Sequence, residues 1–539
     1  MKHEHKWLAS ISAAILMTAA AGAAPALAQP LPEGWISVTA CAPAAPLIPT
    51  NTTESCGSDV LDPIMAGLVT TDTATGAVIN DIAESIETDD NTVWTVTLKQ
   101  GWKFHDGSDV TAASFVDAWN WAAYAPNGQA TNNWFSSIVG YADLNPKAAD
   151  GGKAPEPTAQ TMSGLEILGD HQFRITLKGP VPGFTAQLTY KAFAPLPASF
   201  YDDPAAFGRH PVGAGPFSLE TGSPDTGYKL TAFADYIGAH KPSIAGIDMR
   251  IYTSGEAAYN DLIAGNLDLM SNIPQSKLVD GQWERELDGR VVVQPQASIR
   301  GLGMPWGDAN PQLAKSEMRQ AISMAIDRQT IIDVIFSGVG RAATGWVPPG
   351  VDGYQAGACG EFCTYNPEKA KELLAAAGGY EGDIKIFYAG DSSDKPAMEA
   401  ICNSIRNTLG IECLTSALAD NASFRSLTRS GEATGPFPAN WTMDYPSIDN
   451  AIVPIYSSKG SSNRGSYTNP AFDALIAKAD TQPHDEAIKS YQEAEALLAN
   501  DLPRIPLWNP STTIGHSARI EDLAVRSNGR VDYASVILN

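Results

Sequence analysis

The sequence predicts an α/β protein with mixed sheets, divided into at least two packed units. The chain has 539 residues, and a single hydrophobic core rarely grows beyond about 250–300 residues. Strand-like and helical patterns alternate in the second half of the chain, which is typical of an α/β unit. With 44% hydrophobic and 18% charged residues, the composition is that of a soluble globular protein.

The first 28 residues have the pattern of a signal peptide. Lys2 and Lys6 make the start positive, residues 7–24 are apolar, and Ala26-Leu27-Ala28 fits a small-x-small cleavage site. A membrane anchor is the alternative, because the apolar run is nearly long enough to span a bilayer, but the small-residue exit favours cleavage. No later stretch approaches about 18 uninterrupted apolar residues. We therefore expect an exported, soluble mature protein.

The charge balance argues against nucleic-acid binding. The chain carries 36 basic and 60 acidic residues, and removal of Lys2, Lys6 and Glu4 with the signal peptide leaves 34 and 59, a net charge of −25. Such a surface repels phosphate backbones.

Six cysteines follow the cleavage site, and an even number in an exported protein indicates disulfides. Fifteen pairings can be drawn from six residues. Because the cysteines fall into three local pairs, we expect the bonds Cys41–Cys56, Cys359–Cys363 and Cys402–Cys413. A thiolate metal site is the less favoured alternative, since the C-x3-C spacing at 359–363 has no second such motif.

Cys41 also follows Val38-Thr39-Ala40, which resembles the lipobox of lipoproteins, where the cysteine is lipidated. A lipobox ends the apolar run, whereas residues 29–34 intervene here, and residues 36–39 have the pattern of a first strand. We expect Cys41 to be disulfide-bonded rather than lipidated.

In the first half of the chain, short strands and helices are expected in turn. Strand patterns lie at 35–39, 93–98, 172–177 and 247–251. One helix is expected to begin near 61–63, and others span 112–123, with Thr111 as N-cap, and 254–265. Residues 145–161 are rich in Pro, Gly, Lys and Asp and predict an exposed excursion, and residues 212–217 predict a tight glycine-rich turn.

In the second half, the clearest amphipathic helix is predicted over 316–336, with apolar residues at helical spacing and Gly338 as a stop. Further on, helices are predicted over 367–377 and 394–408, and strands over 383–387 and 411–414. No internal repeat is visible.

Motifs of the common enzyme classes are not found. Residues 338–343, Gly-Val-Gly-Arg-Ala-Ala, match a degenerate dinucleotide-binding pattern, but they follow a helix rather than a strand, so we interpret them as a chance match. The sequence has no P-loop, no G-x-S-x-G elbow and no H-E-x-x-H helix. It therefore indicates neither an enzyme nor a cofactor.

Read in order, several segments resemble family 5 of the bacterial extracellular solute-binding proteins. The most specific is Trp94 to Phe115, WTVTLKQGWKFHDGSDVTAASF, which follows the family pattern of an alternating strand, a G-x-K-F-H-D-G turn and a V-T-A helix start. Residues 212–217, 318–328, 366–374 and 504–507 are also similar to family segments. Together they span nearly the whole mature chain.

The resemblance implies a periplasmic-binding-protein-like fold, in which crossing strands form a hinge between two α/β lobes. Lobe I would comprise 29–80, 209–297 and 506–539, with an inserted subdomain at 81–208, and lobe II would comprise 298–505. The solute would be buried between the lobes as they close. The family role implies a monomeric, extracytoplasmic receptor that delivers its ligand to an ABC permease in the membrane.

In peptide-binding members, a W-x-x-D motif supplies an aspartate that pairs with the α-ammonium group of the ligand. The segment Trp441-Thr442-Met443-Asp444-Tyr445 matches it, so Asp444 is the leading ligand-binding residue, through a charge-assisted hydrogen bond. A structural cap is the alternative for Asp444, and core packing for Trp441. Other residues expected at the cleft are Met443, Tyr445, Asn272 and the loop residues Pro49, Thr50, Asn51 and Thr52, for which plain solvation is the alternative.

One departure from the family leaves the ligand class open. Pro438 stands where some peptide binders have an arginine, so a cationic partner for a peptide C-terminus is not evident. An oligopeptide receptor is the first hypothesis, and an oligosaccharide receptor, suited by stacking on tryptophan, is the second. A secreted hydrolase is the third, and it would need a nucleophile or metal site that the sequence does not show.

Overall fold

The computed structural model describes residues 31–147, 154–278, 281–390 and 392–539. The expected signal peptide, residues 1–28, lies outside these ranges, as does the middle of the expected excursion at 145–161. The remainder of that excursion contains neither helix nor strand. Within the described ranges, no helix combines the length and hydrophobicity that a membrane crossing requires.

A mixed seven-stranded sheet forms the first lobe, in the order β12-β20-β11-β1-β10-β9-β8. Strand β1 runs parallel to β10 and β11, and the other pairs are antiparallel. Helix α1 (Ser55–Leu61) and the hairpin of β21 (Ile520–Val525) and β22 (Val531–Leu538) share the core of this sheet. Its strands are β1 (Trp35–Ala40), β8 (Phe217–Ser223), β9 (Gly227–Ala232), β10 (Gly246–Ile251), β11 (Leu269–Met270), β12 (Val291–Pro295) and β20 (Ser511–His516). At one end of it lie α6 (Gly255–Ile263), α7 (Gln275–Leu278) and α8 (Gln282–Leu287).

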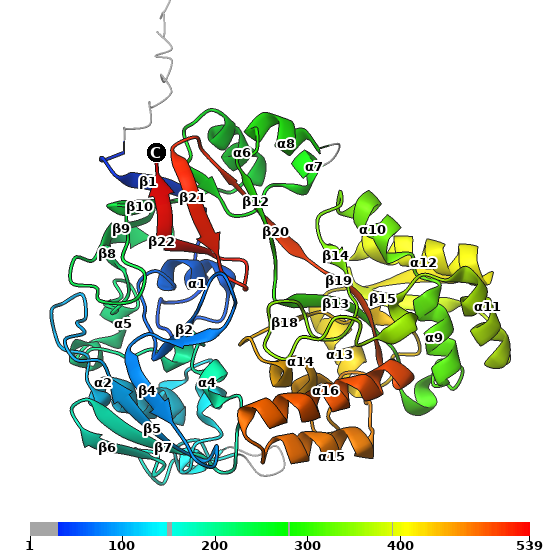
Figure 1. Ribbon diagram of the computed structural model, residues 1–539, viewed down its shortest axis with the longest axis horizontal. Coiled ribbons are helices and arrows are strands. Elements are labelled where there is room, and N and C mark those ends of the chain that lie inside the picture. Colours follow the sequence, from blue (N-terminus) through cyan, green and yellow to red (C-terminus); the bar gives the residue numbers. More distant parts are fainter. Residues whose placement is uncertain (1–30, 148–153, 279–280, 391) are drawn as a thin grey trace, which may run out of the picture.

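Below that sheet in Figure 1, an antiparallel sheet in the order β4-β5-β7-β6 packs against α2 (Ala112–Ala123). The alternation predicted for β5 holds, because Trp94, Val96 and Leu98 are buried. Thr111 is the N-cap of α2, and its N–H donates to Ser114 Oγ at 3.1 Å. The strands are β4 (Ala83–Glu87), β5 (Val93–Leu98), β6 (Leu165–Gly169) and β7 (Gln172–Thr176); smaller elements are the hairpin β2 (Val69–Thr71) and β3 (Val78–Asn80), α3 (Tyr141–Leu144), α4 (Phe184–Gln187) and α5 (Pro204–Phe207).

The second lobe contains a five-stranded sheet, a parallel pair of strands and most of the longer helices. The order of the larger sheet is β14-β19-β13-β17, with β18 also paired to β13. Its strands are β13 (Ser298–Gly303), β14 (Arg341–Ala342), β17 (Phe437–Pro438), β18 (Trp441–Thr442) and β19 (Arg504–Asn509), and the parallel pair is β15 (Ile384–Ala389) and β16 (Cys413–Leu418). The helices are α9 (Ser316–Met324), α10 (Arg328–Ile335), α11 (Pro367–Ala376), α12 (Lys395–Leu409), α13 (Asn421–Ser430), α14 (Ile448–Tyr456), α15 (Pro470–Ala479) and α16 (His484–Asp501).

Two chain segments cross side by side from one lobe to the other (Figure 1). Strand β12 leads into β13 through Gln296 and Ala297, and β19 leads into β20 through Pro510. The Gln296 N–H donates to the Pro510 carbonyl oxygen at 2.9 Å. The fold is therefore the predicted two-lobed α/β fold with crossing strands. The division into 29–80, 209–297 and 506–539, 81–208, and 298–505 stays a prediction. Strand β19 pairs with β13 and β14 in the sheet of the second lobe and extends across the predicted boundary at 505/506.

Two predicted helices differ from those observed. The helix expected to begin at 61–63 instead ends there. It begins at Ser55, because the Glu54 side chain caps α1 by accepting the Gly57 N–H at 2.8 Å. The helix predicted over 316–336 is split into α9 and α10. Asp327 caps α10 by accepting the N–H and the hydroxyl of Thr330, at 3.1 and 2.7 Å. Such local caps compete with helix continuation, and an apolar period continuous across both helices conceals the break.

The three predicted disulfides are confirmed: Cys41–Cys56, Cys359–Cys363 and Cys402–Cys413. The sulfur of Cys41 is thus in a disulfide, as expected in preference to lipidation. The first bond ties β1 to α1, and the third ties α12 to β16. Residues 338–343 lead into the short strand β14 rather than a helix, so they offer no helix N-terminus to a pyrophosphate.

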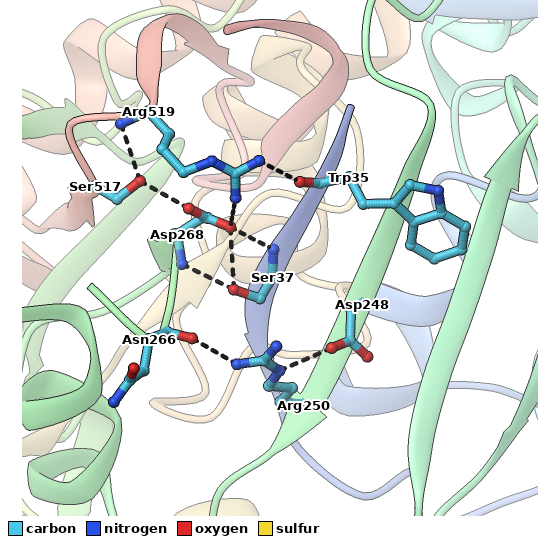
Figure 2. A network of polar contacts seen from close by, with 8 residues as sticks. All are labelled: Trp35, Ser37, Asp248, Arg250, Asn266, Asp268, Ser517 and Arg519. Carbon is cyan, nitrogen blue, oxygen red and sulfur yellow. Dashed lines mark hydrogen bonds and ion pairs between the residues drawn. The ribbon is translucent and has the colours of Figure 1, made fainter. Parts of the chain in front are cut away.

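A buried carboxylate ties the C-terminal segment to the first lobe. Asp268 is 2% exposed and accepts the N–H and hydroxyl of Ser37, the Ser517 hydroxyl and Arg519 Nη1, at 2.8 to 3.1 Å. Arg519 Nη2 also donates to the Trp35 carbonyl oxygen at 2.9 Å. Figure 2 shows these side chains converging on Asp268. One carboxylate thus joins β1, β11 and the segment after β20.

Asp268→Ala should lower the free energy of unfolding by about 3–5 kcal/mol, because it leaves buried donors and a cation without their partner. The matched control is Asp248→Ala. It removes the ion-pair partner of Arg250, a carboxylate more exposed than that of Asp268 (Figure 2), and should cost less than about 1 kcal/mol. Urea unfolding measures both. Equal losses in the two variants would contradict the role given to Asp268.

Glu495 of α16 is fully buried, and its Oε1 accepts the N–H groups of Trp346 and Val347 at 2.9 and 3.2 Å. Its Oε2 has no partner among the described residues. Burial raises the pKa of Glu495 to about 7. The folded protein therefore holds this proton more tightly than the unfolded chain does, and the resulting stabilisation is lost as pH rises through about 7.

Relative to Glu495→Gln, the wild-type protein should lose stability between about pH 5 and pH 8, by on the order of 3 kcal/mol. Urea unfolding across this pH range measures the difference. Glu493→Gln, on the exposed face of the same helix, is the control and should show no such trend. A flat difference for Glu495→Gln would show that burial does not perturb this carboxyl.

Candidate functional site

A cavity of about 580 Å³ lies between the two lobes, within the range of about 300–1,000 Å³ typical of small-molecule sites. The crossing strands form one side, through Gln296 and Ala297. Other walls come from α1 and the residues around it, from residues 188–194, from the turn between β21 and β22, and from residues 442–446 of the second lobe. The cavity therefore lies where closure of the lobes would enclose a ligand.

The W-x-x-D segment supplies the wall from the second lobe. Met443, Asp444 and Tyr445 line the cavity. The Met443 N–H donates to the Ala297 carbonyl oxygen at 2.9 Å, which ties this segment to the crossing strands. Trp441 is half-buried in β18 and is not part of the lining; its ring packs with the core of the second lobe. The geometry favours the core-packing alternative for Trp441.

Asn450, at the start of α14, holds the W-x-x-D segment in place. Its Oδ1 accepts the Asp444 N–H at 3.0 Å and Trp441 Nε1 at 3.3 Å, and its Nδ2 donates to Asp444 Oδ2 at 3.4 Å. Burial raises the pKa of Asp444 above its ordinary value, against the smaller opposing effects of this hydrogen bond and of Lys191. No cation forms an ion pair with Asp444 in the described chain, so its carboxylate is available to a ligand.

Tyr445 joins the second lobe to the inserted subdomain. Its hydroxyl donates to Asp449 Oδ2 at 2.6 Å and accepts Gln187 Nε2 at 3.4 Å. A Cβ at Gly183 would lie only 2.8 Å from Asp449 Oδ1, so glycine permits this close approach. Burial and the neighbouring Asp449 raise the pKa of Tyr445 well above its ordinary value, which keeps the phenol protonated as the donor of this bond.

The inserted subdomain contributes an aromatic and a cationic group that sequence reasoning missed. Tyr190 lines the cavity and stacks on Trp134, with ring centroids 4.1 Å apart. Lys191 Nζ donates to Ser58 Oγ at 2.6 Å and lies 5.2 Å from the centre of the Tyr190 ring. Burial lowers the pKa of Lys191, and burial together with Asp444 raises that of Tyr190 to about 12. These residues lie in a segment without a recognisable motif.

The loop of the first lobe lines the cavity from a residue further along the sequence than predicted. Pro49, Thr50, Asn51 and Thr52 do not line it; the lining begins at Thr53. Thr50 instead packs on the inserted subdomain, where its hydroxyl donates to Gln129 Oε1 at 2.9 Å and its carbonyl accepts the Thr131 hydroxyl at 2.6 Å. The Thr52 hydroxyl turns inward to the Pro46 carbonyl oxygen at 3.2 Å. Asn272 does line the cavity and accepts the Thr512 hydroxyl at 2.9 Å.

The turn between β21 and β22 brings two arginines to the cavity, and sequence reasoning missed both. Arg530 pairs with Asp59 and Asp62 of the α1 region at 2.6 and 3.3 Å. Arg526 pairs with Asp532 at 3.2 Å. Their partners lie far away in the sequence or on the opposite strand of a hairpin, so no local spacing reveals them. Chemically, the cavity offers charged and hydrogen-bonding groups from both lobes, which is an arrangement suited to binding.

Asn450→Ala should lower the free energy of unfolding by about 1–3 kcal/mol, since the Asp444 N–H and Trp441 Nε1 would lose their acceptor in a partly buried place. It should also raise the pKa of Asp444 further, because the carboxylate loses the hydrogen bond from Asn450 Nδ2. Urea unfolding and carboxyl-carbon NMR measure the two effects. Asn500→Ala, at an exposed position, is the control. Unchanged stability and an unchanged Asp444 pKa would contradict the positioning role.

Comparison with known proteins agrees with this architecture. The family model for the middle part of the bacterial extracellular solute-binding proteins, family 5, matches residues 77–463. The glutathione-binding protein GsiB of Salmonella typhi is 26% identical over 530 residues, covering 96% of this chain and 95% of the relative. Heme-binding protein A of Haemophilus influenzae is 26% identical over 473 residues, covering 84% and 81%.

Among solved structures, the unliganded open form of the periplasmic murein tripeptide binding protein MppA matches with a TM-score of 0.79 at 20% identity, covering 94% of this chain and 97% of that one. This likeness confirms the two-lobed fold. The family match covers well over half of the chain and agrees with the motifs from Trp94 onward. The chain therefore belongs to the bacterial extracellular solute-binding proteins of family 5, the extracytoplasmic binding proteins of ABC importers.

Proposed function

We propose that this protein captures short peptides in the cavity between its lobes and delivers them to the membrane permease of an ABC importer. The observation that carries the proposal is the Asp444 carboxylate. It lines the cavity, is oriented by Asn450 and has no cationic partner in the described chain. A ligand ammonium group would supply that partner, through a charge-assisted hydrogen bond in a partly desolvated place.

The position of Pro438 is consistent with this proposal. It lies in β17, paired with Leu302 of β13, and is not part of the cavity lining. The missing arginine therefore does not leave the cavity without cations, because Lys191, Arg526 and Arg530 line it from the first lobe and the inserted subdomain. Of these, Lys191 has no ion-pair partner in the described chain and is available to a ligand carboxylate.

The named ligands of related proteins define the alternatives that a binding experiment must separate. Glutathione is itself a peptide with a free α-ammonium group, so Asp444 would serve it in the same way. Haem and neutral oligosaccharides have no ammonium group to form an ion pair with Asp444, and a sugar could offer it only hydroxyl donors. We also propose that the protein is exported by residues 1–28 and acts as a monomer without catalysing a reaction.

The identity of the ligand is tested by mass spectrometry of the small molecules that the gently purified protein retains. Thermal-shift screens with short-peptide pools, glutathione, haemin and oligosaccharides complement it. A ligand at 100 times its Kd should add about 2.7 kcal/mol to the stability. Retention of a peptide, recovered intact, supports the proposal. Retention of a sugar or of haem, or cleavage of the added peptide, would overturn it.

Asp444→Asn should weaken binding of a retained peptide by about 2–5 kcal/mol, which is roughly 30-fold or more in Kd. The amide keeps the shape of the side chain but removes the charge that faces the ammonium group. Isothermal titration calorimetry measures the change. Asp308→Asn, at an exposed site of the same lobe, is the matched control and should bind normally. Unchanged affinity in Asp444→Asn would exclude the ammonium-pairing role.

A further inference from the structure

The cavity has more negative than positive groups in its lining. Six carboxylates line it, against one lysine, two arginines and one histidine. The carboxylates belong to Glu54, Asp59, Asp62, Asp81, Asp444 and Asp532, and the other groups to Lys191, Arg526, Arg530 and His240.

Four of the six carboxylates are already engaged within the protein. Arg530 pairs with Asp59 and Asp62. Asp532 pairs with Arg526 at 3.2 Å and with His240 at 3.4 Å. The fourth engaged carboxylate is that of Glu54. It accepts the Gly57 N–H as the cap of α1 and also accepts the Ala44 N–H. Two carboxylates, Asp444 and Asp81, are left for a ligand.

Asp81 is the more unusual of these two. It is 5% exposed, and its carboxylate has neither a hydrogen bond nor an ion pair in the described part of the chain. The backbone holds it rigidly: the Asp81 N–H donates to the Leu68 carbonyl oxygen at 2.9 Å, and the next N–H, of Ile82, donates to Gly67 at 3.1 Å. A carboxylate in so desolvated a place is stabilised by a cationic partner, and the described part of the chain supplies none. Its oxygens therefore offer a place in the cavity wall for a cationic group of a ligand.

The groups around Asp81 do not supply that partner. Lys99, Arg526 and His240 are near enough to favour its charged form, and Asp532 to oppose it, but none forms an ion pair with it. Arg526 and His240 are both directed to Asp532. On the cavity side lies Tyr236, a buried aromatic residue whose ring packs edge-on against Trp102 at 5.6 Å. Burial outweighs the nearby cations and raises the pKa of Asp81 to about 6.

We propose that Asp81 forms a second cation-binding subsite, so that the preferred ligand is a short peptide with a basic side chain. This inference rests on the proposed function, in which the α-ammonium group pairs with Asp444. Two unpaired carboxylates and one unpaired ammonium group, that of Lys191, line the cavity. They complement a peptide that carries an α-ammonium group, one basic side chain and one terminal carboxylate.

The test uses six tripeptides on the wild-type protein. Trialanine serves as the host, with lysine at each of its three positions, and each lysine peptide has a match with norleucine, which keeps the chain length without the ammonium group. Isothermal titration calorimetry at pH 7.5 should show at least one lysine peptide binding on the order of ten-fold more tightly than its match. Asp81→Asn should bring that ratio close to one, with the affinity for norleucine peptides unchanged.

Asp89→Asn, an exposed neighbour in the sequence, is the matched control and should keep the wild-type ratio. Thermal melting checks that Asp81→Asn folds. The ratio should also fall in the wild-type protein as pH is lowered through about 6, where Asp81 takes up a proton, and this fall should be much smaller in Asp81→Asn. The α-ammonium group is common to both peptides of a pair, so protonation of Asp444 cancels from this ratio.

The outcomes separate the two proposals. If norleucine peptides bind but lysine peptides bind no better, or if Asp81→Asn keeps the lysine preference, the subsite is wrong and the peptide receptor stands. If none of the six peptides binds and the purified protein retains a ligand without an ammonium group, the proposed function fails and the subsite fails with it.

Discussion

Ala297 lies where the two lobes meet, and two of the segments that line the cavity are hydrogen-bonded to its backbone. Its carbonyl oxygen accepts the Met443 N–H at 2.9 Å, and its N–H donates to the Ser527 carbonyl oxygen at 2.6 Å. Met443 belongs to the segment that carries Asp444, and Ser527 belongs to the turn that carries Arg526 and Arg530. The neighbouring bond from Gln296 to Pro510 joins the two crossing strands. Because Pro510 has no N–H with which to donate a second hydrogen bond, few backbone hydrogen bonds join the two strands at the crossing itself, which suits a hinge.

Most of the charged groups around the cavity form ion pairs with one another. The groups without an ion-pair partner are therefore the ones that a ligand can engage most easily. The ion pairs of Arg530 and Arg526 fasten the β21–β22 turn to α1 and to its own hairpin. A ligand that competed for these groups would have to break existing pairs. Asp444, Asp81 and Lys191 require no such exchange. The ligand is therefore expected to meet the cavity at these three side chains. Asp444 comes from the second lobe, and Asp81 and Lys191 come from the proposed inserted subdomain.

The elements that could be predicted are those whose cause is local. The alternation of Trp94, Val96 and Leu98 and the helix of 112–123 follow from side-chain period and from a capping position. The disulfides were also predictable, because each joins cysteines close in sequence. The limits of α1 and the break between α9 and α10 were missed, since they depend on single caps, Glu54 and Asp327, that a regular apolar pattern conceals. The loop at 49–52 was misplaced because its contacts with Gln129 and Thr131 are long-range.

For the site, the motif at 441–445 was sufficient to place Asp444 at the cavity. Nothing local marks Lys191 or Asp81, which line the cavity from separate parts of the chain, or Asn450, which holds Asp444 in place. By itself the sequence determined the family and the two-lobed α/β fold, and it singled out Asp444 as the leading candidate for ligand binding, because a motif and a hydrophobic period are properties of short segments. Only the tertiary structure decided which charges are already paired, since an ion pair such as that of Arg530 with Asp59 joins residues at opposite ends of the chain. That pairing decides which carboxylates are left for a ligand.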